Sequence, residues 1–554
     1  MSAPGRLRWA GWALALVLLW LVGYPLLLVG FAGAGSLGEF ARRGDEWLAL
    51  WRSVWISLAS VVASAAVGVP LAFVFAWTEF PGRRLLGNLV ALPVALPPLV
   101  GVIAFLFLYG ETGFVPRALQ ALLGLRDAPW RLNGPWAILL VHAYSMYVYF
   151  YLMVRAALLR LDPALEEAAA MLGAGRARIL RRVVLPQLRP ALTGAALLVF
   201  LTSLGSFSAP YLFGGSFRVL PTQIVTSKLN GDLPMASAET VVLAAAALLA
   251  LGLAGAGTSG AGTGGARGVA AARRLPLGKG VRRLATLAGW GLAILLLLPH
   301  LTLLLISLVP TGTWTVELLP PVLSSTNYGA LLREPERLRP LLNSLWMATL
   351  ATLLALAVGL AAARLGRRLR GLVGRLLAAL VALPWAIPGT VFAVALATAF
   401  SVRQPWLGRF VLVGTPIILP LAYLIRALPL TGRAAIAGLG QLDPALEEAA
   451  ATLGAGAWRR LWRITLPLVR PALAAGASVA FIAALGDFVV SIVLYTFTTR
   501  PISIEILSSL RLQDLGVAAA YGVVLVGAST VAFLLFGERE AQSAAGGAPA
   551  EGVA

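Results

Sequence analysis

The chain has 554 residues, of which 59% are hydrophobic and 12% are charged, and its formal net charge is +21. Soluble domains contain about one quarter charged residues, so this composition excludes an ordinary soluble protein and indicates a membrane protein. The positive charges lie between apolar runs rather than on one basic face or arm, which favours membrane topology over nucleic-acid binding. The chain has no cysteine, which excludes disulfides and thiolate metal sites.

Apolar runs long enough to cross a bilayer recur along the whole chain. A spanning helix needs about 20 apolar residues, and the sequence predicts twelve such helices. They cover residues 9–32, 54–77, 87–109, 136–158, 191–212, 237–257, 286–309, 344–363, 376–400, 411–431, 472–495 and 516–536. The first run follows Arg6 and Arg8 but is too long for a signal peptide and lacks a clear cleavage site, so we expect it to be retained.

One polar segment occurs twice. Residues 161–192 match residues 442–473 at 23 of 32 positions, with a constant offset of 442 − 161 = 281. A second pair of similar stretches, "ALPVALPPLVG" from Ala91 and "ALPWAIPGTVF" from Ala382, is offset by 382 − 91 = 291. The sequence therefore predicts two copies of one six-helix module. Because six is even, both copies enter the membrane from the same side, as parallel repeats.

The repeats divide the chain into four segments. A stretch rich in Gly and Ala that becomes basic separates the modules, as expected of a flexible cytoplasmic linker. The segments are residues 1–257 (first module), 258–283 (linker), 284–537 (second module) and 538–554 (a tail expected to be disordered).

The distribution of basic residues predicts the orientation. Most of the 44 Lys and Arg residues fall on the side that the N-terminus occupies, whereas Asp and Glu are divided almost evenly. Cytoplasmic loops are enriched in Lys and Arg. We therefore expect both termini and both polar segments in the cytoplasm. Arg176 and Arg459 should lie there, and Arg43, Trp130 and Asn327 outside.

The repeated segment predicts a short helix followed by a bend. In the first copy, Asp162 suits the helix N-cap and Pro163 the first helical position, while Gly173 allows a sharp turn. Asp443, Pro444 and Gly454 repeat this pattern in the second copy. A second, basic helix should then lead into the next span. Such a short helix, rich in small side chains, predicts a docking element.

The acidic and glycine residues of the repeated segment support the prediction of a docking element more strongly than its basic residues do. Arginines in any cytoplasmic loop serve membrane topology and contact lipid headgroups, which would explain Arg176, Arg178, Arg181 and Arg182 equally well. Topology requires neither acidic residues nor a duplicated bend. The Glu-Ala-Ala and Gly positions therefore indicate a function.

Both segments resemble the cytoplasmic "EAA" loop of binding-protein-dependent ABC importer permeases. That loop has Glu-Ala-Ala, three residues, Gly, nine residues, Ile, one residue and Leu-Pro. The departure is Val183, where the family has Ile. The pattern appears here as Glu167-Ala168-Ala169, Gly173, Val183 and Leu185-Pro186, and again as Glu448-Ala449-Ala450, Gly454, Ile464 and Leu466-Pro467.

The resemblance implies an all-α membrane protein with the permease fold of type I ABC importers, in a bacterial inner membrane. In that family the loop is a coupling helix that docks on a separate ATPase subunit, so two copies of an ATPase and an extracytoplasmic substrate-binding protein are implied as partners. The implied coupling residues are Glu166, Glu167, Ala168, Ala169, Gly173, Glu447, Glu448, Ala449, Ala450 and Gly454.

The chain is expected to be a translocation subunit rather than an enzyme. The stretch nearest to a phosphate-binding loop, Gly278-Lys279-Gly280, lacks both the first Gly and the hydroxyl residue of that motif, so ATP is expected to be used only by the partner. No cofactor or metal ion is expected in the chain, because the two histidines, His142 and His300, have no Asp, Glu or Cys at ligand spacing.

Broken helices and intramembrane polar groups predict the transport pathway. Prolines at 93, 97, 98, 384 and 388 should kink or unwind the third and ninth spans, although a kink tolerated by neighbouring helices is an equal alternative. "LGSF" at Leu204 pairs with "LGDF" at Leu485, which places Ser206 opposite Asp487. The pathway candidates are Pro93, Pro97, Pro384, Pro388, Ser206, Tyr211 and Asp487. For the aromatic stretch from His142 to Tyr151, an aromatic belt or helix packing is favoured over a polar passage.

The substrate is predicted from resemblance alone. Fusion of two modules and the "LGSFSAPYLFGG" and "LGDF" stretches resemble the iron(III) importer permeases, a group similar to the thiamine and, more distantly, the polyamine and sulfate permeases. Ferric iron is therefore the predicted solute, with thiamine as the alternative. From another class, an ion-coupled secondary transporter would need more intramembrane acids than Asp487 and Glu239. A membrane enzyme is disfavoured, because nucleophile and metal clusters are missing.

Overall fold

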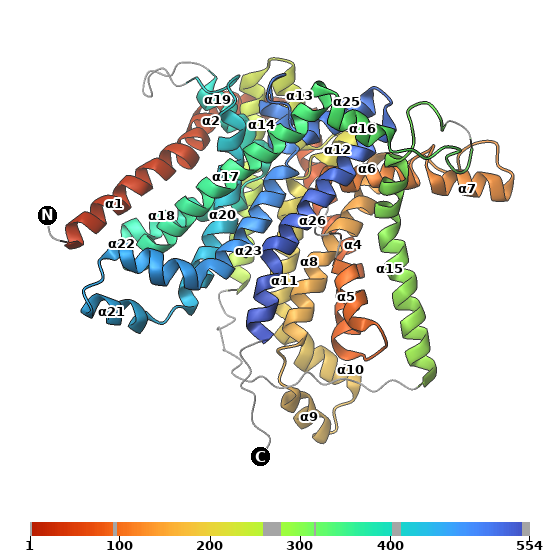
Figure 1. The fold of residues 1–554 in the computed structure, drawn as a ribbon. Helices are drawn as coiled ribbons and strands as arrows, with labels where there is room; N and C mark the ends of the chain where they lie inside the picture. Colours follow the sequence, from red (N-terminus) through yellow and green to blue (C-terminus); the bar gives the residue numbers. More distant parts are fainter. Residues whose placement is uncertain are drawn as a thin grey trace. The chain divides into compact units, whose positions relative to one another are not determined.

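The computed structural model describes residues 3–91, 93, 97–258, 279–314, 317–369, 371–401 and 411–545, and this part of the chain contains helices and no β-strand (Figure 1). Within these described residues, ten helices are long and apolar enough to span a membrane. One further pair, α18 (Leu372–Ala386) and α19 (Gly389–Phe400), is bent by 112° between its members, which raises the number of spans to eleven if the pair counts as one. The predicted all-α membrane fold is confirmed.

The twelfth predicted span, residues 411–431, differs from the others. It corresponds to α20 (Ile418–Gln441). This helix is long enough to cross a membrane, but it is not one of the ten apolar spans. Arg426 and Arg433 make it more polar than its neighbours, and most of its apolar residues are buried. The third predicted span, 87–109, is divided into α5 (Arg83–Ala91) and α6 (Pro98–Tyr109). Prolines cannot donate a helical hydrogen bond, which explains the break.

The remaining elements follow the order of the sequence. In the first repeat they are α1 (Ala3–Leu18), the π-helical η1 (Leu19–Gly23), α2 (Tyr24–Ala34), α3 (Leu37–Arg42), α4 (Gly44–Trp77), α7 (Phe114–Leu123), α8 (Gly134–Leu158), α9 (Pro163–Met171), α10 (Arg176–Ile179), the π-helical η3 (Leu180–Val184), α11 (Leu185–Leu204), α12 (Ser208–Phe213), α13 (Leu220–Leu229) and α14 (Leu233–Thr258). In the second they are α15 (Lys279–Ser307), α16 (Thr326–Arg333), α17 (Pro335–Arg368), α21 (Pro444–Thr452), α22 (Ala457–Arg460), the π-helical η4 (Leu461–Thr465), α23 (Leu466–Leu485), α24 (Val489–Leu494), α25 (Ile502–Arg511) and α26 (Leu515–Ala545).

The first compact unit consists of Met1–Leu37, Gly231–Val241 and Ser324–Ala554. Helices α17, α20 and α23 pack together, and α26 packs on α23. The first helices of the chain join this unit, because α1 packs against α18 and α2 against α19. α26 continues to Ala545, into the segment expected to be a disordered tail, and residues 546–554 lie outside the described part of the chain.

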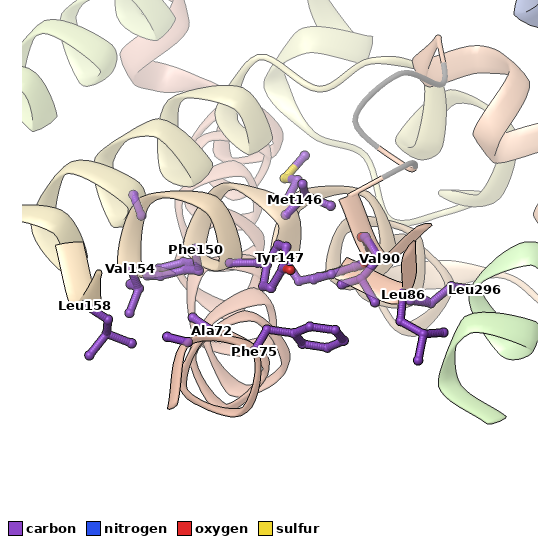
Figure 2. Packing of buried hydrophobic residues seen from close by; sticks show 14 of the residues in the cluster. Ala72, Phe75, Leu86, Val90, Met146, Tyr147, Phe150, Val154, Leu158 and Leu296 are labelled. Carbon is purple, nitrogen blue, oxygen red and sulfur yellow. Dashed lines mark hydrogen bonds between the residues drawn. The ribbon is translucent and has the colours of Figure 1, made fainter. Parts of the chain in front are cut away.

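The second compact unit consists of Gly38–Asn230 and Val242–Leu323. Its centre is formed by α4, α8 and α11, with α5 beside α8, and α15 packs against α5 and α6. Figure 2 shows part of the core, in which Phe75 of α4 and Tyr147 of α8 lie among Leu86, Val90 and Leu296. These side chains are almost completely buried, so close packing fixes the helices that lead to the polar loop.

The compact units do not coincide with the two sequence repeats, 1–257 and 284–537. The first helices of the first repeat, α1 and α2, pack with the second repeat, and the first helix of the second repeat, α15, packs with the first. Most of the predicted linker, residues 259–278, lies outside the described part of the chain.

Candidate functional site

The first repeated loop has the predicted helix and bend. The Asp162 carboxylate caps α9 by accepting a hydrogen bond from the backbone N–H of Ala164 at 3.0 Å. The helix begins at Pro163, and Gly173 follows it with a φ of 77°. This left-handed conformation is favourable for glycine and strained for residues with a Cβ.

The second loop repeats this geometry in the other compact unit. Asp443 accepts a hydrogen bond from the N–H of Ala445 at 2.9 Å, α21 begins at Pro444, and Gly454 has a φ of 79°. In both loops the helix start and the bend that the sequence predicts are confirmed. The two loops therefore present the same backbone shape.

Both short helices lie at the surface of their units, although a few of their side chains, Glu447 among them, are partly covered. Neither α9 nor α21 contains a buried residue. The apolar side chains at the bend are the most exposed to solvent: Met171 is 90% exposed, and Leu172 and Leu453 are each 87% exposed. The neighbouring Glu167 and Glu448 are exposed as well. An exposed apolar tip beside an exposed carboxylate, on a short surface helix, is typical of a protein-interaction site.

A π-helical turn joins each loop to the following membrane helix. It covers Leu180–Val184 in the first copy and Leu461–Thr465 in the second, between a short helix of one turn and α11 or α23. π-Helical turns within helices are often found at functional positions. The sequence predicted one continuous basic helix here and gave no signal for the wider turn.

Glu447, predicted as a coupling residue, is held by its own unit. Its Oε1 accepts a hydrogen bond from Thr465 at 2.6 Å, and its Oε2 lies 2.7 Å from the Arg368 guanidinium. Arg364 lies 3.5 Å away. Burial raises the pKa of this carboxyl, but the hydrogen bond from Thr465 and the two arginine charges outweigh that effect and hold the pKa below its ordinary value. Glu447 is therefore ionised at neutral pH.

Asp487 lies in a buried polar cluster of the second repeat. Its Oδ2 pairs with Nε of Arg426 at 3.0 Å, and its Oδ1 accepts the backbone N–H of Val490 at 2.8 Å. Ser491 donates to the backbone oxygen of Asp487 at 2.6 Å and bonds to the Tyr423 hydroxyl. The acid that the sequence singled out is thus paired, as an intramembrane charge requires. The sequence prediction missed Arg426, although a charge inside an apolar run was a signal for it.

The first repeat has a neutral cluster at the equivalent positions. At the offset of 281 residues, His142, Ser145 and Ser206 correspond to Tyr423, Arg426 and Asp487. Nε2 of His142 lies 2.9 Å from the Ser206 hydroxyl, and Nδ1 lies 2.8 Å from Ser60 and 3.2 Å from Ser203. One repeat therefore places hydroxyls and an imidazole where the other places an ion pair.

The second repeat brings three predicted pathway residues close together. Pro384 lies inside α18 and Pro388 caps α19 at the 112° bend. The Arg426 guanidinium lies directly against Gly389, and a Cβ there would collide with it. The bend thus lies beside the Arg426–Asp487 pair.

The other pathway candidates lie in the first repeat. Pro93 and Pro97 are buried between α5 and α6. Tyr211 is on α12 and stacks on Phe207 with ring centroids 5.0 Å apart. The buried Tyr147 and Tyr151 donate hydrogen bonds to backbone oxygens of α5, which agrees with a packing role for the aromatic stretch. The described residues contain no group of three or more His, Asp or Glu that could hold a metal ion.

A repeated helical membrane module with an exposed helix and bend in each copy defines a transport permease. The chain belongs to the family of binding-protein-dependent transport system inner membrane components, whose model matches residues 68–257 and 338–537. It is accordingly a multi-pass inner-membrane protein with a translocation role.

Permeases of known name are similar in sequence to this chain, some over most of its length and others over about a third. A probable ABC transporter permease, y4fN of Sinorhizobium fredii, is 31% identical over 91% of this chain and 89% of its own length. The ferric transport system permease FbpB of Actinobacillus pleuropneumoniae is 30% identical over 80% of this chain and 64% of its own length. The molybdenum transport permease ModB of Escherichia coli is 35% identical over 33% of this chain. The family is thus shared by permeases whose names give different solutes.

Proposed function

We propose that this ABC importer permease carries ferric iron, delivered by a substrate-binding protein on the outer side, into the cytoplasm. The importer assignment rests on the duplicated helix and bend, because two surface elements of the same backbone shape fit a pair of docking sites. One lies at Glu166–Gly173 and the other at Glu447–Gly454. ATP binding and hydrolysis are assigned to a separate ATPase subunit, in two copies, and this chain contributes no cofactor.

Transport follows from movement of the two repeats. When the ATPase subunits close, the exposed helices α9 and α21 move with them. Each helix is joined through a π-helical turn to a membrane helix, α11 or α23, so the movement reaches the ends of those helices at Ser206 and Asp487. Access to a central pathway would then alternate between the two sides of the membrane.

The assignment of ferric iron rests on similarity in sequence and in module fusion. FbpB proteins, named as ferric transport permeases, match over about four fifths of the chain, at 30% and 29% identity. Permeases named for molybdenum and sulfate match about one third of the chain. A permease that receives its cargo from a binding protein needs only a weak site. Oxygen atoms of Ser206, Tyr211 and Asp487 suit a hard cation, and equally a small polar solute.

The orientation is tested by labelling single cysteines. Because the natural chain has none, each introduced thiol gives an unambiguous signal. Cysteines replacing Arg176 and Arg459 should react with membrane-impermeant reagents only after the cytoplasmic side is opened. Those replacing Arg43 and Trp130 should react in intact cells, because the excess of basic residues marks the cytoplasmic side. Asn327 is predicted on the same outer side but is only 4% exposed, so a cysteine there is expected to react poorly. Labelling of the two repeated loops from opposite sides would exclude parallel repeats.

The substrate is tested by reconstituted uptake. The chain, its ATPase and its binding protein in proteoliposomes should accumulate radiolabelled ferric iron when ATP is present, and not when ATP is absent. Thiamine serves as the competing solute under the same conditions. ATP-driven accumulation of thiamine without any response to iron would replace the solute assignment while leaving the importer function in place.

A further inference from the structure

The two exposed loop helices differ in how they are attached to the membrane helices of their own units. Figure 1 shows α21 and α17 of one unit and α9 of the other. In the second repeat, the last two turns of α17 carry Arg364, Arg367 and Arg368. Two of these guanidinium groups reach the Glu447 carboxylate of α21, and Arg367 donates to the backbone oxygen of Leu439 at the end of α20.

A single carboxylate therefore joins three elements. Glu447 contacts α17 through Arg364 and Arg368, and η4 through the Thr465 hydroxyl. Its own backbone oxygen also accepts a hydrogen bond from Arg460 of α22, at 3.4 Å. The side chains of Glu447 and Arg364 are only 18% and 17% exposed. A partly buried, multiply bonded pair is screened less by salt than an exposed surface pair.

The first repeat keeps the acid of this link but lacks its arginines. Helices α4 and α17 both contain 34 residues, and aligning their starts places Phe73 and Trp77 where α17 has Arg364 and Arg368. Their rings pack edge to face, with centroids 4.8 Å apart. Val184 occupies the position of Thr465. Glu166, the counterpart of Glu447, forms no ion pair with any residue that the structure describes.

We propose that Glu447 is a positioning residue that ties the second loop helix to α17, so that the two repeats respond unequally to identical ATPase subunits. In the second repeat a displacement of α21 pulls directly on α17 as well as on α23. In the first repeat the described residues form no ion pair between α9 and α4, and a displacement of α9 reaches the membrane through α10, η3 and α11. The inequality rests on the proposed docking function, but the link itself is a property of this chain.

The link is tested first on the chain alone, by distances between pairs of spin labels. Cysteines replacing Leu365 and Leu453 report on α17 and the end of α21, and those replacing Val74 and Leu172 occupy the equivalent positions of the first repeat. The Glu447→Gln variant should broaden the distance distribution of the first pair. The matched Glu166→Gln variant should leave that of the second pair unchanged. Equal behaviour of the two variants would overturn the proposal.

Acidification gives an independent readout of the same link. Because the pKa of Glu447 is lowered by its partners, the link is fully present above the ordinary Glu pKa of 4.5 and is lost as the pH falls through the lowered value. The Leu365–Leu453 label pair should therefore broaden only below pH 4.5, and in Glu447→Gln it should be broad at every pH. Absence of this difference would contradict the ionic link.

Transport measurements then test the inequality of the repeats. In proteoliposomes with ATPase and binding protein, Glu447→Gln should lower solute uptake per ATP hydrolysed by roughly five- to tenfold, as expected for loss of one coupling interaction. Glu166→Gln removes the same acid from the other docking helix but breaks no ion pair, so it should lower this ratio by a clearly smaller factor. Arg368→Gln, which alters a more exposed partner, should reproduce the effect if Glu447→Gln is poorly folded. Failure of the unaltered chain to show ATP-driven uptake would count against the proposed function, whereas the label distances would still decide the link.

Discussion

Gly173→Asp and Gly454→Asp variants are expected to insert into the membrane normally but to lose ATP-driven uptake by at least about 100-fold when combined. Both glycines have a left-handed backbone, with φ values of 77° and 79°. A Cβ in this conformation costs roughly 1–2 kcal/mol. No atom of the residues that the structure describes lies within 4 Å of a Cβ added at either glycine, so the new carboxylate would project from the exposed bend. The combined change in shape and charge should weaken association with the ATPase.

Two matched substitutions separate these causes. Asn adopts the left-handed conformation more readily than most residues and carries no charge, so Gly173→Asn should retain most uptake. Gly175→Ala lies two residues away at a φ of −66°, where a Cβ is tolerated, and should behave as the unaltered protein. Co-purification of the ATPase and uptake are measured together. Normal uptake by the Gly173→Asp/Gly454→Asp double variant would rule out a docking role for these loops.

Asp487→Asn is expected to lower the stability of the protein by about 1–3 kcal/mol, because it removes the counter-charge of the Arg426 guanidinium, which is 35% exposed and can be partly solvated. The carboxylate is only 5% exposed and pairs with Arg426 at 3.0 Å. Asn can still accept the N–H of Val490, so local capping of α24 should persist. Thermal unfolding in detergent gives the change in stability. Ser206→Ala, at the equivalent position of the neutral cluster, should cost about 1 kcal/mol.

A double variant separates the stability of the cluster from transport. Replacement of both partners, as in Arg426→Met/Asp487→Asn, removes the unpaired charge and should recover much of the lost stability. If Asp487 lines the pathway, uptake will remain impaired after stability has recovered. Recovery of uptake together with stability would assign the pair to packing and remove Asp487 from the pathway candidates.

Sequence periodicity and composition predicted the local elements well. Asp162 and Pro163 determine where α9 begins, because capping and proline geometry act within one turn. Gly173 and Gly454 marked the bends for the same local reason. The break between α5 and α6, and that between α18 and α19, followed from prolines. These features need no knowledge of distant residues.

The structural features that the sequence did not predict depend on contacts between residues far apart in the chain. Arg364 and Arg368 lie about 80 residues before Glu447, and an arginine near a helix end is explained equally well by topology. Packing of α1 and α2 with the second repeat also has no local signal, because a uniformly apolar helix is compatible with many neighbours. The charges of Arg426 and Asp487 are both visible in the sequence, but their pairing could be recognised only after the helices were placed.

The first helices of each repeat pack with the other repeat. During synthesis, α1 and α2 are therefore made long before most of the helices that they contact. Helices α1 and α2 leave the ribosome nearly 300 residues before residue 324, where the main part of their unit begins (324 − 37 = 287). At a synthesis rate of about 5–20 residues per second, they wait for roughly 15–60 s without most of their final neighbours. An 18-residue stretch within Leu7–Ala34 has a mean hydropathy of 2.4, so lipid can hold it as a lone helix during that interval. A chain interrupted after its first repeat would leave this helix without its packing partners.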